Sequence, residues 1–488
     1  MPDITKFPLG ASRELRLNQA ANAVWADPQW IAKRRAPNPH EKGIWLFEPG
    51  SNMVFLGAIG DQLIGARDDR HLMTIAGSRA GKGESAVIPN LIAYPGSILV
   101  IDPKGENARA TKSSRDGTRF AKTGLKQDVF VLDPFGRSGH PTSSFNPLDM
   151  IKPESDEAVD DAALIADGLV IALHGEGKHW SDSARNFLRG LVLYVRVAMP
   201  PELQNLIWVR RLLTNDKSGF DLLLKDMALR GDSCNGVIRG AANSMAAKWE
   251  EERSGVVSTL IEQTDFLDSP RMATALERSD FTLSDLKRKP TTIYLCLPAS
   301  RMATHNRWLR VIINLAVQAM EHETTKPPHP VLFIMDEFAI LDHLSSVEKA
   351  AGQIAGFDVR LWPILQDLSQ LKSIYSDRWE TFMGNAGLLQ FFGNNDLTTL
   401  EYLSKRLGKS TIVQINQSEV TTPQKAQGLT GQSMSLHETE LMASDEIGTF
   451  FSRQSETQLL LWPGAPPIAI DRVKYHKHTF FGGKYDGQ

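Results

Sequence analysis

The stretch "HLMTIAGSRAGKGESAVIPNLIAYPGSILVIDPKGEN", residues 71–107, decides how the chain is interpreted. An apolar run leads into a glycine-rich turn with one lysine, and a helix-like segment and a second apolar run follow. This is the order of a phosphate-binding loop, in which backbone N–H groups at a helix N-terminus and a lysine face the anion. The turn therefore supplies the candidate nucleotide-binding residues, which are Gly77, Ser78, Arg79, Ala80, Gly81, Lys82, Gly83 and Glu84.

The turn departs from the consensus motif at two positions. The first glycine position, counted back from Lys82, holds Ala76, and Gly77 comes one residue late. Gly83 stands where a hydroxyl side chain normally binds Mg²⁺. The stretch alone leaves three interpretations open: a nucleotide site, a degenerate one, and a glycine-rich turn that binds nothing.

The apolar runs along the chain predict an α/β fold. They are continuous rather than alternating, as is typical of strands covered on both faces, and they include "HLMTIA", "SILVID", "DVFVLD", "VLFIMDEF" and "GLLQFFGN". Residues 156–285 carry helical spacing and no strand pattern, which indicates an all-helical insertion. We therefore expect an N-terminal segment (1–66), a discontinuous α/β domain (67–155 and 286–470), an all-α domain (156–285) and a fraying tail (471–488). The segment 414–447, rich in Gln, Ser and Thr, is expected to be a mobile loop.

A second cluster of polar residues follows two of the later strands. Asp336 and Glu337 end "VLFIMDEF", where an aspartate can hold Mg²⁺ and the next glutamate can orient and deprotonate the attacking water. Gln366 ends "LWPIL", where an amide can contact the γ-phosphate or the water. Together with Lys82, these residues favour a nucleotide site that uses ATP and Mg²⁺.

Composition is ordinary for a globular protein and excludes few classes. The chain has 488 residues, 42% hydrophobic residues and a net charge of -3, so any basic nucleic-acid surface must be local. Two cysteines match no metal spacing, and no segment is apolar enough to span a bilayer. These features predict a cytoplasmic location.

These motifs in combination resemble the type IV secretion coupling proteins, the TraG/TraD-type ATPases of conjugative DNA transfer, which are similar to FtsK-like motors. The likeness rests on "AGSRAGKGESAVIPNL", "SILVIDPKGEN", "SFNPLD", "HWSDSARNFLRGL", "LFIMDEFAIL" and "LWPILQDLSQLKSIY". It implies a RecA-like domain that carries an all-α domain, a hexameric ring, and delivery of relaxase-bound DNA or effector proteins to a secretion channel.

The resemblance also implies residue roles. Lys82 would bind the β- and γ-phosphates, Asp336 the metal and Glu337 the water, while Gln366 would sense the γ-phosphate. Branches of the family have Gly-Lys-Gly loops, so Gly83 would be a family trait. The residue Gln353 occupies a region where some relatives have an arginine finger, so the candidates for that role are Arg360, Arg406 and Arg453.

Family members usually begin with transmembrane helices, and this sequence shows none. The chain would then reach the inner membrane only through a partner, and the segment with Lys33, Arg34 and Arg35 near Trp25 and Trp30 is a candidate for docking. Two alternatives to a secretion motor remain: a nucleotide-gated adaptor with little hydrolysis, and an FtsK-like DNA translocase outside secretion.

Overall fold

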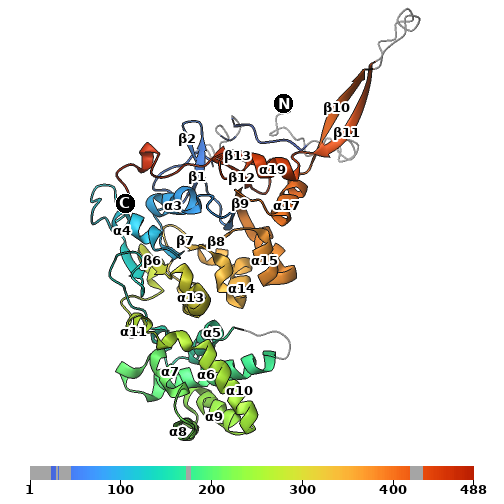
Figure 1. Ribbon diagram of the computed structural model, residues 1–488. Helices are drawn as coiled ribbons and strands as arrows, with labels where there is room; N and C mark the ends of the chain where they lie inside the picture. Colours follow the sequence, from blue (N-terminus) through green and yellow to red (C-terminus); the bar gives the residue numbers. More distant parts are fainter. Residues whose placement is uncertain (1–22, 29–30, 32–44, 172–176, 418–431, 488) are drawn as a thin grey trace, which may run out of the picture.

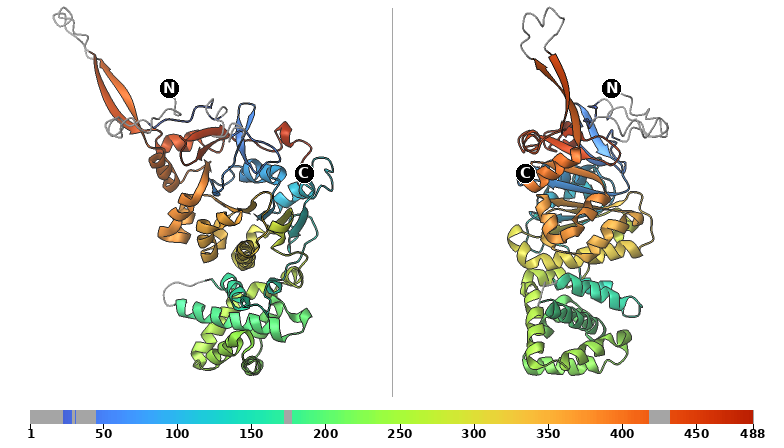
Figure 2. Two further views of the ribbon diagram at one scale, coloured as in Figure 1. Left: turned by 180° about the vertical axis from the view of Figure 1, so that it is seen from behind. Right: turned by 90° about the vertical axis from the view of Figure 1, so that its right-hand side faces the viewer.

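The computed structural model describes residues 23–28, 31, 45–171, 177–417 and 432–487. The main features of these residues are a large α/β body, a bundle of helices and a projecting two-stranded hairpin (Figure 1). The bundle lies at the end of the molecule opposite the hairpin, as the two further views also show (Figure 2). Within the described residues, no helix is both long enough and apolar enough to cross a membrane.

One sheet of 11 strands forms the core of the α/β body. In spatial order its strands are β2 (Gln62–Ala66), β1 (Val54–Ile59), β13 (Ile468–Asp471), β12 (Thr457–Leu461), β9 (Ala386–Phe392), β3 (His71–Ala76), β8 (Val359–Leu365), β7 (Val331–Met335), β4 (Ile98–Asp102), β6 (Thr291–Cys296) and β5 (Asp128–Leu132). The seven strands from β9 to β5 are parallel, and the four before them in this order are antiparallel. The loops that follow β9, β3, β8, β7 and β4 therefore meet at one edge of the sheet.

Both faces of the parallel strands are buried, and this explains the continuous apolar runs. Leu99 and Ile101 of β4 belong to one hydrophobic cluster, while Ile98 and Val100 belong to the cluster on the opposite face. One face is covered by α3 (Ile88–Ala93) and α4 (Glu106–Asp116), and the other by α13 (Ala299–His322), α14 (Ser345–Gln353), α15 (Leu368–Tyr375), α16 (Trp379–Asn385), α17 (Leu397–Leu407) and α19 (Ser444–Phe450). The α/β class is confirmed.

The inserted helices run from α5 to α12 with no strand among the described residues between β5 and β6. They are α5 (Ala158–Leu169), α6 (Lys178–Ala198), α7 (Leu206–Leu213), α8 (Lys217–Ala228), α9 (Val237–Ala246), α10 (Glu250–Gln263), α11 (Pro270–Leu276) and α12 (Asp285–Arg288). Helix α5 packs on α13 of the α/β body, so the bundle and the sheet share a contact. Gly168 fits closely there, because a Cβ at this position would lie 2.7 Å from a methyl carbon of Val311. The division of the chain into separate domains stays a prediction.

The expected N-terminal segment, residues 1–66, contributes two strands to the sheet. Strands β1 and β2 form a hairpin, and Ala58 of β1 pairs with Asp471 of β13. Glycines interrupt the apolar pattern here because the strands lie unusually close together: a Cβ at Gly57 would lie 2.2 Å from the carbonyl oxygen of Asp471. The basic cluster 33–35 and Trp30 lie outside the described residues.

The tail was expected to fray, and the structure shows that it is packed. Val473, Tyr475 and Phe481 are buried in one cluster with Phe55 of β1 and Ile88 of α3. Isolated aromatic side chains anchor this segment, and their irregular spacing gives no periodic signal in the sequence.

The segment 414–447 was expected to be a loop, but its described residues form regular structure. Strands β10 (Lys409–Gln417) and β11 (Gln432–Glu440) pair in antiparallel register, and α19 follows them. Ile412 is 50% exposed and Leu436 is 67% exposed, so neither apolar side chain packs on the body. None of the hairpin side chains that the structure describes is buried, and this explains why the sequence shows no alternating pattern here.

Candidate nucleotide-binding site

The turn after β3 has the backbone shape of an anion-binding loop. Gly81 has φ +89° and Arg79 has φ +56°, and Lys82 leads directly into one turn of π-helix, η2 (Gly83–Val87). Pro89 explains that turn. Because proline has no N–H, it cannot form the α-helical hydrogen bond to the preceding turn, and the N–H of Ile88 donates to Gly83 O in the π-helical pattern. The loop therefore presents backbone N–H groups at the start of a helix.

Gly77 is a glycine for a packing reason. Its N–H donates to the carbonyl of Phe392 at the end of β9 (3.1 Å), and a Cβ at this position would lie 1.9 Å from Gly393 O. The contact between the loop and the end of β9 thus explains why the glycine stands at position 77, one residue after the consensus position. The preceding Ala76 is the last residue of β3 and is fully buried.

Gly83, in contrast, is not required by packing. A Cβ there would meet no heavy atom of the described residues within 4 Å. The nearest hydroxyl in the sequence after the loop, Ser85, is buried and donates to Gly81 O at 2.9 Å. No hydroxyl of this helix start therefore faces outward in the way that the consensus loop presents one.

Three of the predicted site residues meet in space. Lys82 Nζ lies 3.4 Å from Glu337 Oε1, and Gln366 Nε2 donates to Glu337 Oε2 at 3.1 Å. They lie in the segments that follow β3, β7 and β8, which are neighbours in the sheet with β8 in the middle. Glu337 adopts φ +56°, a sparsely populated conformation for a non-glycine residue that is typical of functional sites.

Asp336 lies beside Glu337 in a crowded acidic environment. The pKa of Asp336 is raised to about 6, chiefly by burial; Lys82 opposes the rise, and the neighbouring Glu337 and Asp102 contribute to it. Asp102 is a site neighbour that sequence reasoning missed: it ends β4, whose Ile101 pairs with Met335 of β7. Burial also raises the pKa of Asp102 to about 6, although its Oδ2 accepts from the N–H of Ala108.

A divalent cation fits this charge arrangement, because two crowded carboxylates at adjacent strand ends would be compensated by it. Asp336 is the carboxylate available for direct or water-mediated contact, since Asp102 accepts backbone hydrogen bonds from the turn that follows it. No group of three or more His, Cys, Asp or Glu side chains with metal-binding geometry occurs in the described part of the chain. Most ligands of a cation at Asp336 would therefore be water and phosphate oxygens, as is usual for Mg²⁺.

Arg472 is a further residue that the sequence did not reveal. It follows β13, is 6% exposed, and donates to the carbonyls of Ala80 in the loop, Ser452 (3.4 Å) and Arg453 (2.9 Å). Its guanidinium carbon also lies 4.8 Å from the ring centroid of Phe392. Arg472 therefore fixes the outer side of the loop against β9 and the segment before β12.

The structure separates the three candidate arginine fingers. Arg360 is only 4% exposed at the start of β8, away from the loop, and donates to Asn52 O (3.3 Å), so it cannot reach a neighbouring subunit. Arg453 is exposed and lies beside Gly393, close to the chain's own loop: a Cβ at Gly393 would be 3.8 Å from the Cα of Arg453. Arg406 is exposed on α17. For Arg406 and Arg453 the role stays a prediction.

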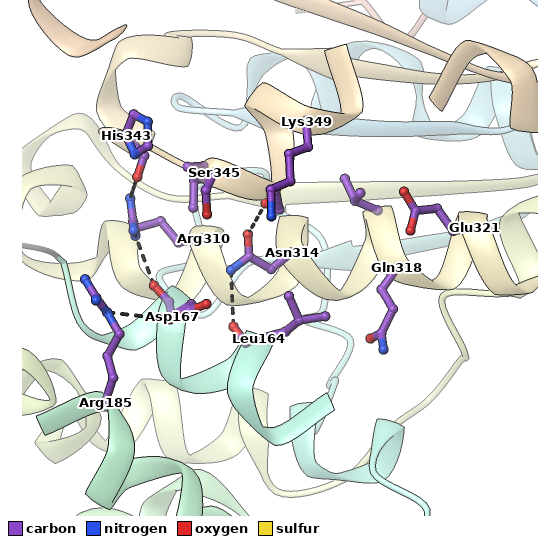
Figure 3. Close-up of a pocket in the computed structure, with 13 residues that line it drawn as sticks. Leu164, Asp167, Arg185, Arg310, Asn314, Gln318, Glu321, His343, Ser345 and Lys349 are labelled. Carbon is purple, nitrogen blue, oxygen red and sulfur yellow. Dashed lines mark hydrogen bonds and ion pairs between the residues drawn. The ribbon is translucent and has the colours of Figure 1, made fainter. Parts of the chain in front are cut away.

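A cavity of about 480 Å³ lies elsewhere, where the bundle meets α13 and α14 (Figure 3). Arg310 of α13 lies at its edge, 3% exposed, and donates to carbonyls of two different segments. On the bundle side these belong to Gly168 (3.1 Å) and Asp167 (3.4 Å), and on the other side to Leu341 and His343 (3.1 Å), just after Glu337. The phosphate loop does not line this cavity. Arg310, however, bonds both to the bundle and to the segment that follows Glu337.

The chain matches one protein family over nearly its full length. The model of the family described as "Type IV secretory system Conjugative DNA transfer" covers residues 20–485. Protein VirD4 of Rhizobium radiobacter is 27% identical over 419 residues, which are 83% of this chain and 57% of that protein. Conjugal transfer protein TraG of Escherichia coli is 28% identical over 371 residues, covering 72% and 56%. The chain thus spans a little more than half the length of these curated relatives.

The fold is also shared with solved structures. The bacterial conjugative coupling protein TrwBdeltaN70, in its unbound monoclinic form, superposes with a TM-score of 0.67 at 15% identity, covering 93% of both chains. The plasmid coupling protein TrwB in complex with ADP and Mg²⁺ gives a TM-score of 0.65 at 15% identity, covering 93% of this chain and 94% of that one. At this identity the likeness shows the fold. Taken with the match of the family model, it means that the chain belongs to the type IV secretory system conjugative DNA transfer family.

Proposed function

We propose that this chain is an ATP-dependent coupling protein of a type IV secretion or conjugation system. It would hydrolyse ATP with Mg²⁺ and drive relaxase-bound DNA or an effector protein towards the channel. The observation that carries the proposal is the contact of Lys82 and Gln366 with the same carboxylate, Glu337, at the mouth of an anion-binding loop. TrwB structures with the ATP analogue ADPNP, with the GTP analogue GDPNP and with ADP and Mg²⁺ share this fold, which supports a nucleotide with Mg²⁺ at this site.

Each residue would have a separate task in hydrolysis. Backbone N–H groups of residues 77–84 and the Lys82 ammonium would hold the phosphates. Asp336 would hold the metal ion, which supplies charge neutralisation at the β- and γ-phosphates. Glu337 would orient the attacking water and accept its proton, while the Gln366 amide keeps the Glu337 carboxylate in place.

The Lys82–Glu337 ion pair sets an order on these events. Lys82 Nζ lies 3.4 Å from Glu337 Oε1, and its side chain is only 10% exposed. Phosphate oxygens would compete for the same ammonium group, and its withdrawal would leave the Glu337 carboxylate free to accept a proton. Binding of the nucleotide and activation of the base are thereby linked.

The proposal extends to assembly and location. We infer a hexameric ring as the active form, with secretion-channel components as partners and contact with the membrane through a partner protein. The chain itself would then be cytoplasmic or peripheral at the inner membrane. Family membership supports these inferences, and DNA versus protein cargo stays open.

Phosphate release from ATP tests the proposal, measured without DNA and with single- or double-stranded DNA. Lys82→Ala should abolish turnover, whereas Lys104→Ala should not, because that lysine side chain is 69% exposed and pairs only distantly with Glu106 (3.9 Å). Glu337→Gln should bind ATP but hydrolyse it about 100-fold more slowly or worse, since it removes the base and keeps the shape. Wild-type turnover in the Lys82→Ala variant would contradict the site assignment.

A nucleotide-gated adaptor is the second candidate. It is favoured by Gly83 and by the inward hydroxyl of Ser85, which leave the metal without the usual protein hydroxyl. In that case the wild type would bind ATP without turnover under every DNA condition. Strong stimulation by double-stranded DNA in the absence of secretion partners would instead favour an FtsK-like translocase.

A further inference from the structure

The two residues that follow β9, Gly393 and Asn394, form a turn that we call the corner after β9. It contains a buried amide that the proposed mechanism does not use. Asn394 is 5% exposed, and its Nδ2 donates to the main-chain carbonyl of Gln366 at 3.0 Å. Its Oδ1 is buried and has no hydrogen-bond partner among the described residues. A buried acceptor without a partner is costly, at about 1–3 kcal/mol, so this one calls for an explanation.

A purely local role in starting the next helix does not account for Asn394. Helix α17 begins at Leu397, and its cap is Asp396, whose side chain accepts from the N–H of Thr399 at 2.8 Å. Asn395, which lies between Asn394 and the cap residue Asp396, is exposed. The amide of Asn394 instead points back to the strand end that carries Gln366.

The same corner is in tight contact with the phosphate loop. Gly77 N donates to Phe392 O (3.1 Å), and a Cβ at Gly77 would lie 1.9 Å from Gly393 O. A Cβ at Gly393 would lie 2.6 Å from the Cβ of Ala80 in the loop. A shift of the loop therefore moves the corner after β9 with it.

Gln366 is held from two sides by amide side chains. Its N–H donates to Gln370 Oε1 at 3.1 Å, and its carbonyl accepts from Asn394 Nδ2. With both main-chain groups fixed, its side chain reaches Glu337 Oε2. Gln370 lies on the same helix that follows Gln366, whereas Asn394 is the member of this pair that also moves with the loop.

We propose that Asn394 is a positioning residue for ATP hydrolysis, which fixes Gln366 relative to the phosphate loop and offers its free Oδ1 to a water of the nucleotide site. This inference rests on the proposed ATPase function. It adds a fourth strand end, that of β9, to the three that carry Lys82, Glu337 and Gln366. Asn394 acts through Gln366, and the phosphates themselves are held by the loop.

The test compares Asn394→Ala with Asn395→Ala in the full chain. Removal of one buried hydrogen bond that positions a reacting group should lower kcat by about tenfold or more, while KM for ATP and the affinity for ADP change less than about threefold. Asn395→Ala should match the wild type. The second readout is binding: the wild type should bind a non-hydrolysable ATP analogue and ADP with different affinities, and Asn394→Ala should reduce that difference.

A double-mutant cycle with Gln366→Ala separates positioning from general stability. If Asn394 acts through Gln366, Asn394→Ala should cost little more in kcat once Gln366 is already alanine. Additive losses in kcat, or equal losses of ADP and analogue affinity, would mean a structural role and would overturn the inference. A wild type without any turnover would overturn the proposed function and this inference together, whereas normal turnover in Asn394→Ala would overturn this inference alone.

Discussion

Two glycines of the loop, Gly77 and Gly83, should respond to alanine in opposite ways. In the sequence both are glycines close to Lys82, and neither stands where the consensus expects a glycine. In the structure a Cβ at Gly77 would lie 1.9 Å from Gly393 O, whereas in the part of the chain that the structure describes a Cβ at Gly83 would meet no heavy atom within 4 Å. We therefore predict that Gly77→Ala disrupts nucleotide binding and that Gly83→Ala does not.

The magnitude follows from the distance that must be gained. Ordinary van der Waals contact begins at 3.4 Å, so the loop and the corner after β9 must separate by roughly 1.5 Å to accept the methyl group. Overpacking of this kind costs about 1–3 kcal/mol, which corresponds to a loss of roughly 5- to 150-fold in affinity if the strain falls on the loop. Gly83→Ala carries no such strain, and alanine favours a helix over glycine by up to about 1 kcal/mol.

The assay is titration of each variant with a fluorescent non-hydrolysable ATP analogue in the presence of Mg²⁺. Circular dichroism confirms that each variant is folded at the temperature of the titration. Wild-type affinity in Gly77→Ala would refute the reasoning, because it would show that the contact with Gly393 does not hold the loop. An equal loss in Gly83→Ala would refute it as well, since no described residue lies within 4 Å of that methyl group.

Three further predictions concern stability and coupling. Because the pKa of Asp336 is raised to about 6, the folded chain keeps a proton that the unfolded chain has released, so stability should fall as pH rises from about 4 to 6. Asp336→Asn should remove the part of this loss that Asp336 contributes, while Asp102, whose pKa is also raised to about 6, keeps its own part. The variant should also raise the unfolding temperature at pH 7 without Mg²⁺, whereas the exposed control Asp61→Asn should not. Arg310→Met leaves carbonyls on both sides of α13 without donors, and should destabilise the chain by about 3 kcal/mol or more in denaturant unfolding. Replacement of residues 156–285 by a short Gly/Ser bridge should leave the sheet folded, and loss of strand signal in circular dichroism would contradict this.

The parts of the fold that could be predicted are those with strong local patterns. Strands β3, β4, β7, β8 and β9 are continuous apolar runs, because each is covered on both faces, and all five were found. The parallel arrangement then brings the residues after these strands to one edge, and for this reason Lys82, Glu337 and Gln366 meet.

The parts that were missed depend on contacts between distant segments. Arg472 lies in a stretch without periodicity and Asn394 at the end of the apolar run of β9, and each acquires its place only when β13 or β9 pairs in the sheet. Asp102 was visible as a strand-end carboxylate, but its pairing beside Asp336 depends on β4 and β7 being neighbours. Strand order is a property of the whole fold, and local spacing does not encode it.

The turn that carries Glu337 joins the chemistry at the sheet edge to the inserted helices. Glu337 and Asp342 both have positive φ, at +56° and +52°, so the short η8 segment (Phe338–Leu341) between them is bounded by two strained residues. Such strain persists only where surrounding contacts impose it. On one side Lys82 and Gln366 hold the Glu337 carboxylate.

On the other side, two buried residues of α13 hold the carbonyls of the same turn. Asn306 donates to Ile340 O at 3.0 Å, and Arg310 donates to the carbonyls of Leu341 and His343. Arg310 also donates to the end of α5, so the helix that leads into the bundle and the turn that positions Glu337 share one guanidinium group. A change in the contact between the bundle and α13 therefore cannot leave the Glu337 turn unaffected, because the same five N–H donors of Arg310 serve both.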